Sequence, residues 1–97
     1  MSEHYILVDG EPRPVDLLTW GKWLQTAERQ LARTTVSEGV EVSTVFLGLD
    51  HSFGQGPPLI WETMIFGGPH DSYQPRASTL AAAEAQHASA VRLAGTP

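Results

Sequence analysis

Residues 40–68, VEVSTVFLGLDHSFGQGPPLIWETMIFGG, decide the fold of this 97-residue chain. Apolar and β-branched residues recur through two stretches, Val40 to Leu49 and Leu59 to Phe66, and a loop rich in glycine and proline joins them. Such residues favour β-strands. We therefore predict that strands over about 40–49 and 59–66 form the centre of a small antiparallel sheet.

Both faces of this predicted strand pair carry apolar side chains. Val42 and Phe46 share one face of the first strand, while Val45 and Leu47 share the other. A sheet face that meets water is usually polar, so we expect helices to cover one face and a partner subunit or a ligand to cover the second. The pattern favours a homodimer.

The N-terminal residues predict a short hairpin. Residues 4–8, HYILV, are β-prone, and Asp9-Gly10 is a favoured two-residue hairpin turn. Pro12 and Pro14 lack the amide hydrogen that a central strand needs. The N-terminal strand is therefore predicted at about 4–8, and its returning arm is an edge strand at best.

Two helices are predicted on either side of the central stretch. The first, over about 16–33, begins at the capping residue Asp16 and carries an apolar stripe at spacings of three and four. Gly21 inside it indicates that another element packs closely there. The second helix covers about 79–94 and is rich in alanine. The predicted fold is a single α+β domain over 1–97, with both helices packed on one face of the sheet.

Composition limits the function classes. The chain has no cysteine, which excludes disulfides and thiolate chemistry, and its net charge is −5 with scattered basic residues, which disfavours direct nucleic-acid binding. Its N-terminus has acidic residues where a signal peptide would be basic, and it has no long apolar run. We expect a soluble cytoplasmic protein with no membrane contact.

The loop between the central strands is the predicted functional surface. It is longer than an ordinary hairpin loop, and its glycines and its proline pair predict a fixed shape. The candidate binding residues in this loop are Asp50, His51, Ser52, Phe53, Gly54, Gln55 and Gly56.

Few residues have a spacing typical of a catalytic or metal site. His51 and Glu62 could form an acid–base pair, although a capping role for Asp50 and a backbone contact for His51 explain these residues better. The histidines show no metal-ligand spacing, and His87 lies on an apolar stripe as a core histidine would. Glu62 and Arg76 are predicted to form a structural ion pair. We predict no catalytic residue, metal or cofactor.

Two segments resemble an uncharacterised family of small phage and prophage proteins. The resemblance rests on the phrase VSTVFLGLDH-x-F-G-x-GPPL-x-WETM-x-FGG, and then on R-x-S-T followed by A-E-A-x-H near the C-terminus. It extends weakly over most of the chain. Proteins of that family are generally recorded as being of unknown function, so the resemblance implies a small phage-type accessory protein without naming its activity.

Three functions remain open at this point. The first is a non-enzymatic interaction protein that binds a host or phage protein, for example as an inhibitor of a host defence system. The second is a small-molecule binder, with its pocket between the long loop and the sheet. The third is a small hydrolase or isomerase that uses His51 and Glu62.

Overall fold

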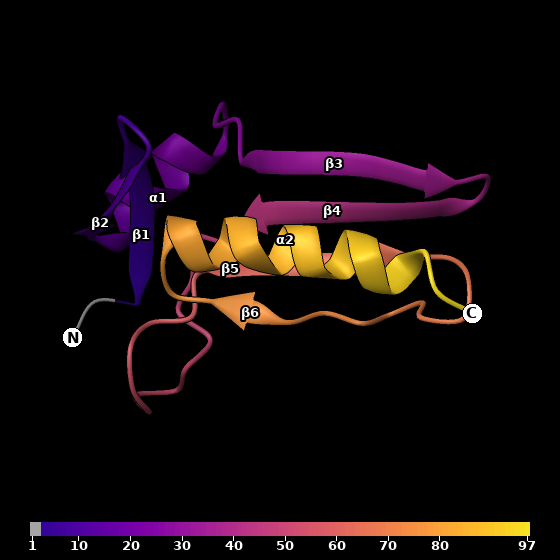
Figure 1. The fold of residues 1–97 in the computed structure, drawn as a ribbon. Coiled ribbons are helices and arrows are strands. Elements are labelled where there is room, and N and C mark those ends of the chain that lie inside the picture. Colours follow the sequence, from indigo (N-terminus) through magenta and orange to yellow (C-terminus); the bar gives the residue numbers. More distant parts are fainter. Residues whose placement is uncertain (1–2) are drawn as a thin grey trace.

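The computed structural model describes residues 3–97 and contains two antiparallel sheets and two helices, an α+β fold as predicted (Figure 1). A hairpin and a helix come first, and a four-stranded sheet with a second helix follows. In chain order the elements are β1 (His4–Val8), β2 (Glu11–Val15), α1 (Leu17–Leu24), β3 (Gln30–Ser37), β4 (Val40–Phe46), β5 (Trp61–Phe66), β6 (Arg76–Ala77) and α2 (Leu80–Ala94).

The β1–β2 hairpin forms as the sequence predicts. Asp9 and Gly10 have φ angles of 53° and 80°, which suit a tight turn between two twisted strands. The strands pair so that Leu7 faces Pro12. Because the two strands form a sheet of their own, the prolines of β2 interrupt no central ladder.

The four-stranded sheet has the order β3-β4-β5-β6, and every neighbouring pair is antiparallel. The predicted central strands 40–49 and 59–66 are present as the shorter β4 and β5. Beyond β4, the backbone at Gly48 takes φ 77°, and a Cβ atom there would lie 2.9 Å from the indole nitrogen of Trp20. A glycine is therefore required where the chain leaves the sheet.

The predicted helix over 16–33 is wrong at its C-terminal half. Asp16 does cap α1, because its Oδ1 accepts the amide of Thr19 at 2.8 Å, but the helix ends at Leu24 and residues 30–37 form strand β3. The β-branched run Thr34-Thr35-Val36 favours a strand. Pairing with β4 supplies the ladder that this run needs, so tertiary contacts override the helical spacing.

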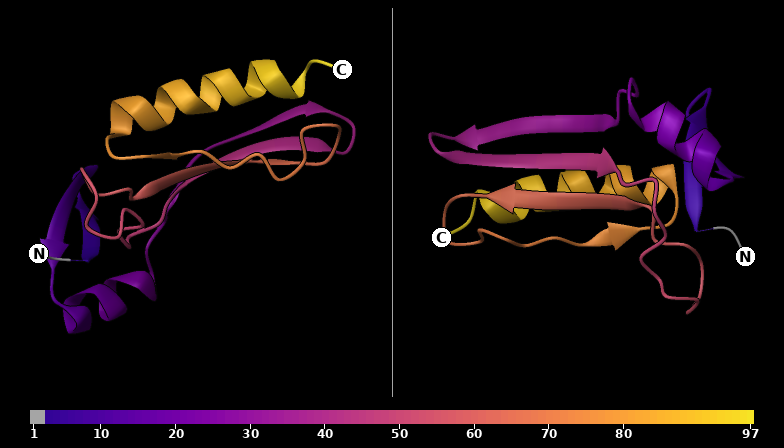
Figure 2. Two further views of the ribbon diagram at one scale, coloured as in Figure 1. Left: turned by 90° about the horizontal axis from the view of Figure 1, so that it is seen from below. Right: turned by 180° about the vertical axis from the view of Figure 1, so that it is seen from behind.

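Helix α2 covers one face of the four-stranded sheet, whereas α1 lies beyond the end of that sheet beside β1 (Figure 2). The prediction that both helices share one sheet face is therefore wrong for α1. Thr79 caps α2 by accepting the amide of Ala82 at 3.1 Å, and the helix matches the predicted 79–94. Neither helix in the described part of the chain is long and apolar enough to cross a membrane.

The core beneath α2 consists of two apolar clusters with a polar chain between them. One cluster includes Phe46, Trp61 and Ala83, and the other includes Val42 and Ile65. Trp23 of α1 reaches the first cluster with its ring, whose centroid lies 5.8 Å from that of Phe46. The core thus lies mainly between α2 and the sheet, and side chains of the β1–β2 hairpin and α1 pack against it at one end.

His87 is the centre of the polar chain. Its Nε2 lies 2.8 Å from the hydroxyl of Thr34 and its Nδ1 lies 2.8 Å from that of Thr44, which in turn lies 2.6 Å from the hydroxyl of Thr63. Burial lowers the pKa of His87 from its ordinary 6.5 because the charged ring would lose its hydration. His87 is therefore a hydrogen-bonded core histidine, as its position in the sequence suggested.

Candidate functional site

The loop over residues 50–58 is held at its base by the carboxylate of Asp50. Its Oδ1 accepts the amides of Ser52 at 2.7 Å and Leu59 at 3.0 Å, and its Oδ2 accepts the hydroxyl of Ser52 at 3.0 Å. The desolvation of Asp50 raises its pKa, but the hydrogen bonds from Ser52 and Leu59 and the nearby His51 outweigh it, so the pKa lies below its ordinary value. One side chain thus ties both ends of the loop together.

The tip of this loop presents Phe53 to solvent. Its side chain is 89% exposed, and its φ of 55° is in the left-handed region, which a bulky residue seldom adopts. The turn that contains Phe53 is closed by the amide of Gln55, which donates to the carbonyl of Ser52 at 3.0 Å. Since strained backbone is retained where the surrounding structure enforces it, the loop holds Phe53 in an outward position.

The predicted loop residues therefore divide into two groups. Asp50 and Ser52 point into the hydrogen-bonded base, while the residues of the tip are exposed. His51 is half-buried, and its amide donates to the carbonyl of Leu59 at 3.0 Å. The exposed tip consists of Phe53, Gly54, Gln55 and Gly56.

The structure does not bring His51 and Glu62 into one site. The backbone of His51 contacts Leu59, three residues before Glu62. The carboxylate of Glu62 instead accepts the Nε hydrogen of Arg76 at 3.1 Å, which is the predicted structural pair. No group of three or more potential metal ligands lies together among residues 3–97.

The face of the sheet opposite α2 differs from the predicted apolar face. The pair Arg76–Glu62 lies on it, and Arg33 pairs with Glu41 at 2.6 Å nearby. Leu47, which was expected on this face, lies beyond the end of β4. The face therefore mixes ion pairs with apolar side chains and gives less reason for a homodimer than the sequence did.

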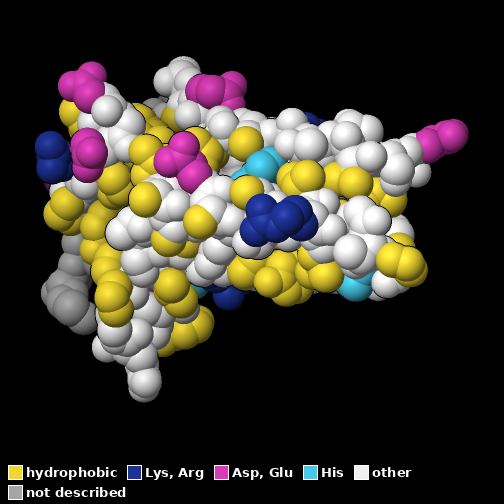
Figure 3. Space-filling view, viewed as in Figure 1, with side chains coloured by type: hydrophobic (Ala, Val, Ile, Leu, Met, Phe, Trp, Pro, Cys, Tyr) yellow, Lys and Arg dark blue, Asp and Glu magenta, His cyan; other side chains and the backbone are white. Residues whose placement is uncertain are grey.

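Hydrophobic side chains are exposed at the end of the molecule formed by the β1–β2 hairpin and α1 (Figure 3). Leu17 and Leu18 at the start of α1 are 61% and 77% exposed, and Val8 at the end of β1 is also exposed. The sequence predicted an apolar stripe on α1 and also predicted that the sheet would cover this helix. In the structure the two leucines are exposed.

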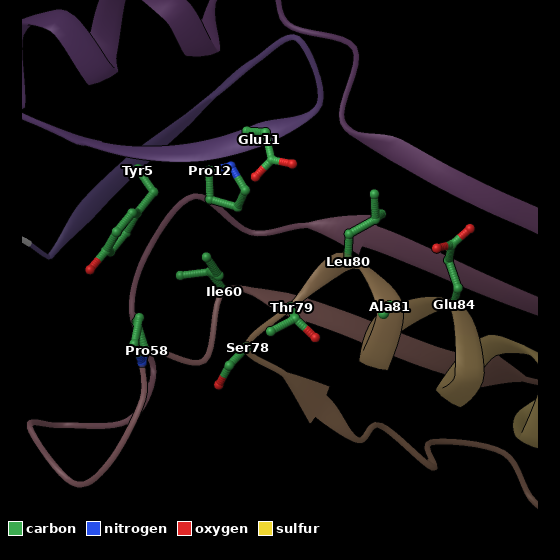
Figure 4. A pocket seen from close by; sticks show the side chains of 10 residues that line it. All are labelled: Tyr5, Glu11, Pro12, Pro58, Ile60, Ser78, Thr79, Leu80, Ala81 and Glu84. Atoms are coloured by element: carbon green, nitrogen blue, oxygen red, sulfur yellow. The ribbon is translucent and has the colours of Figure 1, made fainter.

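A groove of about 540 Å³ lies between the β1–β2 hairpin, the end of the loop and the start of α2 (Figure 4). Its polar lining residues are Glu11, Ser78, Thr79 and Glu84, and its apolar lining residues are Tyr5, Pro12, Pro58, Ile60, Leu80 and Ala81. Only Pro58 belongs to the predicted loop. Sequence reasoning missed the others because they come from three distant segments and form no motif.

The comparisons with known proteins add no relative. No protein-family model, no curated protein and no solved structure matches the chain. The function must therefore be argued from the loop, the groove and the exposed apolar residues.

Proposed function

We propose that this chain is a non-enzymatic interaction protein whose anchor is Phe53. The observation that carries the proposal is an aromatic side chain, 89% exposed, at the tip of a loop tied at its base by Asp50. Aromatic residues dominate the binding energy of many protein interfaces when a pocket of the partner encloses them. A loop fixed before binding loses little conformational entropy on association.

The exposed leucines of α1 supply a second apolar surface in support of this proposal. Leu17 and Leu18 are large side chains that a protein without a partner would gain by burying. Burial of these two side chains by a partner would stabilise the complex, so association by apolar contact accounts for their exposure.

The partner that we propose is a host or phage protein in the cytoplasm. This part of the proposal rests on the resemblance to small phage and prophage proteins, and inhibition of a host defence system is one form it would take. The net charge of −5 supports a protein partner over a nucleic acid. Self-association through the open sheet face remains a prediction.

The test compares two exposed aromatic residues. Tagged wild-type protein, Phe53→Ala and Tyr73→Ala are used to capture partners from host lysate, and the captured protein is then titrated against each variant. We expect Phe53→Ala to weaken binding at least about tenfold with an unchanged melting temperature. Tyr73, 46% exposed and outside the loop, provides the matched control. Equal binding by Phe53→Ala and the wild type would refute the proposal.

Binding of a small molecule is a second candidate function, and the groove is the observation that favours it. Its volume of about 540 Å³ falls within the range of known ligand sites. A rise in melting temperature on addition of a small-molecule filtrate of cell extract, lost in a variant with Ala81→Trp, would support this function. An unchanged melting temperature would argue against it.

A further inference from the structure

The charge of the groove is entirely negative. Glu11 comes from β2 and Glu84 from α2, and Figure 4 shows Leu80 between them. No lysine or arginine is among the described residues that line the groove. The potential in the groove therefore favours a cation over an anion.

These two carboxylates have no partner within residues 3–97. Other acidic side chains of the chain are engaged: Glu41 and Glu62 form ion pairs, and Asp50 accepts amide hydrogens. The carboxylates of Glu11 and Glu84 form neither a hydrogen bond nor an ion pair with any other described residue. They are thus free to receive a cation from outside.

The apolar lining indicates that the cationic group should be attached to an aliphatic chain. Tyr5, Pro12 and Leu80 present ring and aliphatic surface beside the carboxylates. A compact hydrated ion would gain nothing from that surface. A lysine side chain matches both features, because its aliphatic stem packs on apolar groups while its ammonium group stays near a carboxylate.

We propose that the groove binds a lysine-bearing segment of a partner protein. This step rests on the proposed interaction function, because Pro58 both ends the loop and lines the groove. The groove therefore begins where the loop ends. The open shape of the groove, bounded by the hairpin on one side and α2 on the other, suits a continuous peptide chain (Figure 4).

The test is an NMR titration of ¹⁵N-labelled protein with a short, blocked peptide of alternating proline and lysine. Control peptides carry glutamine or glutamate at the lysine positions, and hexane-1,6-diamine tests the free amine. We expect the lysine peptide to shift the amide resonances of Ile60 and Leu80, with an affinity that falls as salt is added. Glu84→Gln should weaken this binding about two- to fivefold.

Glu38→Gln provides the matched control, since it removes the same charge from the turn between β3 and β4. The proposal fails if the glutamine or glutamate peptide binds as well as the lysine peptide, or if Glu38→Gln weakens binding as much as Glu84→Gln. Equal binding of the diamine would overturn the assignment to a peptide segment. The titration uses neither Phe53 nor the captured partner, so this test and the capture test fail separately.

Discussion

The two helices of this protein differ in how far their side chains are buried. Helix α2 is rich in alanine, yet it buries Ala83, His87, Ala90 and Ala94 against the sheet. Helix α1 has the larger side chains and the clearer apolar stripe, yet none of its residues is fully buried. Small side chains let α2 approach the strands closely, so burial follows from proximity to the sheet and not from the strength of the apolar pattern.

This difference separates a cohesive part of the molecule from an exposed one. The sheet and α2 enclose both apolar clusters and the His87 chain. The opposite end, made of α1, the β1–β2 hairpin and the loop with Phe53, leaves large apolar side chains in solvent. We therefore expect substitutions in the first part to change stability and substitutions in the second to change binding.

The largest expected effect contrasts Phe46→Ala with Leu18→Ala. Phe46 is completely buried and contacts rings from α1 and β5, so its truncation should destabilise the protein by about 3–5 kcal/mol. Leu18 is 77% exposed, so its truncation should change stability by less than about 0.5 kcal/mol. Urea unfolding of both variants measures the two values.

A large loss for Leu18→Ala would break the comparison, because it would mean that α1 is covered in solution. Light scattering over a range of concentrations identifies that case. A dimeric mass for the wild type and a monomeric mass for Leu18→Ala would place the helix in a self-association interface.

The local pattern of the chain predicted the elements whose contacts lie close in sequence. The apolar and β-branched runs predicted β4 and β5, the capping residue Asp16 predicted the start of α1, and α2 lies where the alanine-rich stretch predicted it. The helix was predicted beyond Leu24 because Leu31 continues the helical spacing of apolar residues. In the structure Leu31 belongs to strand β3 and packs against the core from there. Only the ladder with β4, a tertiary contact, decides that stretch.

The second prediction concerns His87 and pH. Because burial lowers the pKa of His87 in the folded protein below 6.5, the unfolded chain binds a proton more readily. The stability that this difference contributes is fully present above pH 6.5 and is lost as the pH falls below that value. Unfolding free energies measured at successive pH values should show this decrease, well above the range in which Asp50 titrates.

The variant His87→Gln isolates the effect. An amide keeps a donor and an acceptor for the two threonine hydroxyls but does not titrate. We expect the variant to lose about 1–2 kcal/mol at pH 7.5 and to show a shallower decrease toward acid. An unchanged slope would mean that other groups cause the pH dependence. Thr63→Val removes the hydroxyl at the end of the hydrogen-bonded row that starts at His87. It should lower the free energy of unfolding and leave its dependence on pH unchanged.

The sequence predicted the loop but not the groove, because the loop is formed by one continuous segment and the groove by residues far apart in the chain. The glycines and the Pro57-Pro58 pair predicted a loop of fixed shape, and in the structure Asp50 holds the base of that loop. The groove needs both Glu11 and Glu84 in its lining, two residues far apart in sequence. Both residues line the groove because the hairpin lies near the start of α2, an arrangement that no local pattern specifies (Figure 1).

The smallest expected effect tests the exposed helix itself. The sequence indicated close packing at Gly21, but a Cβ atom built there would have no neighbour within 4 Å. Gly21→Ala should therefore stabilise the protein, by up to about 1 kcal/mol, because alanine favours the helical backbone. Thermal unfolding measures the gain. Weaker binding of the captured partner by this more stable variant would mean that the partner approaches α1 closely at Gly21. The added methyl group would then lower binding while it raises stability, which would assign α1 to the binding part of the molecule. If binding is unchanged, the contact of the partner is confined to the loop and its surroundings.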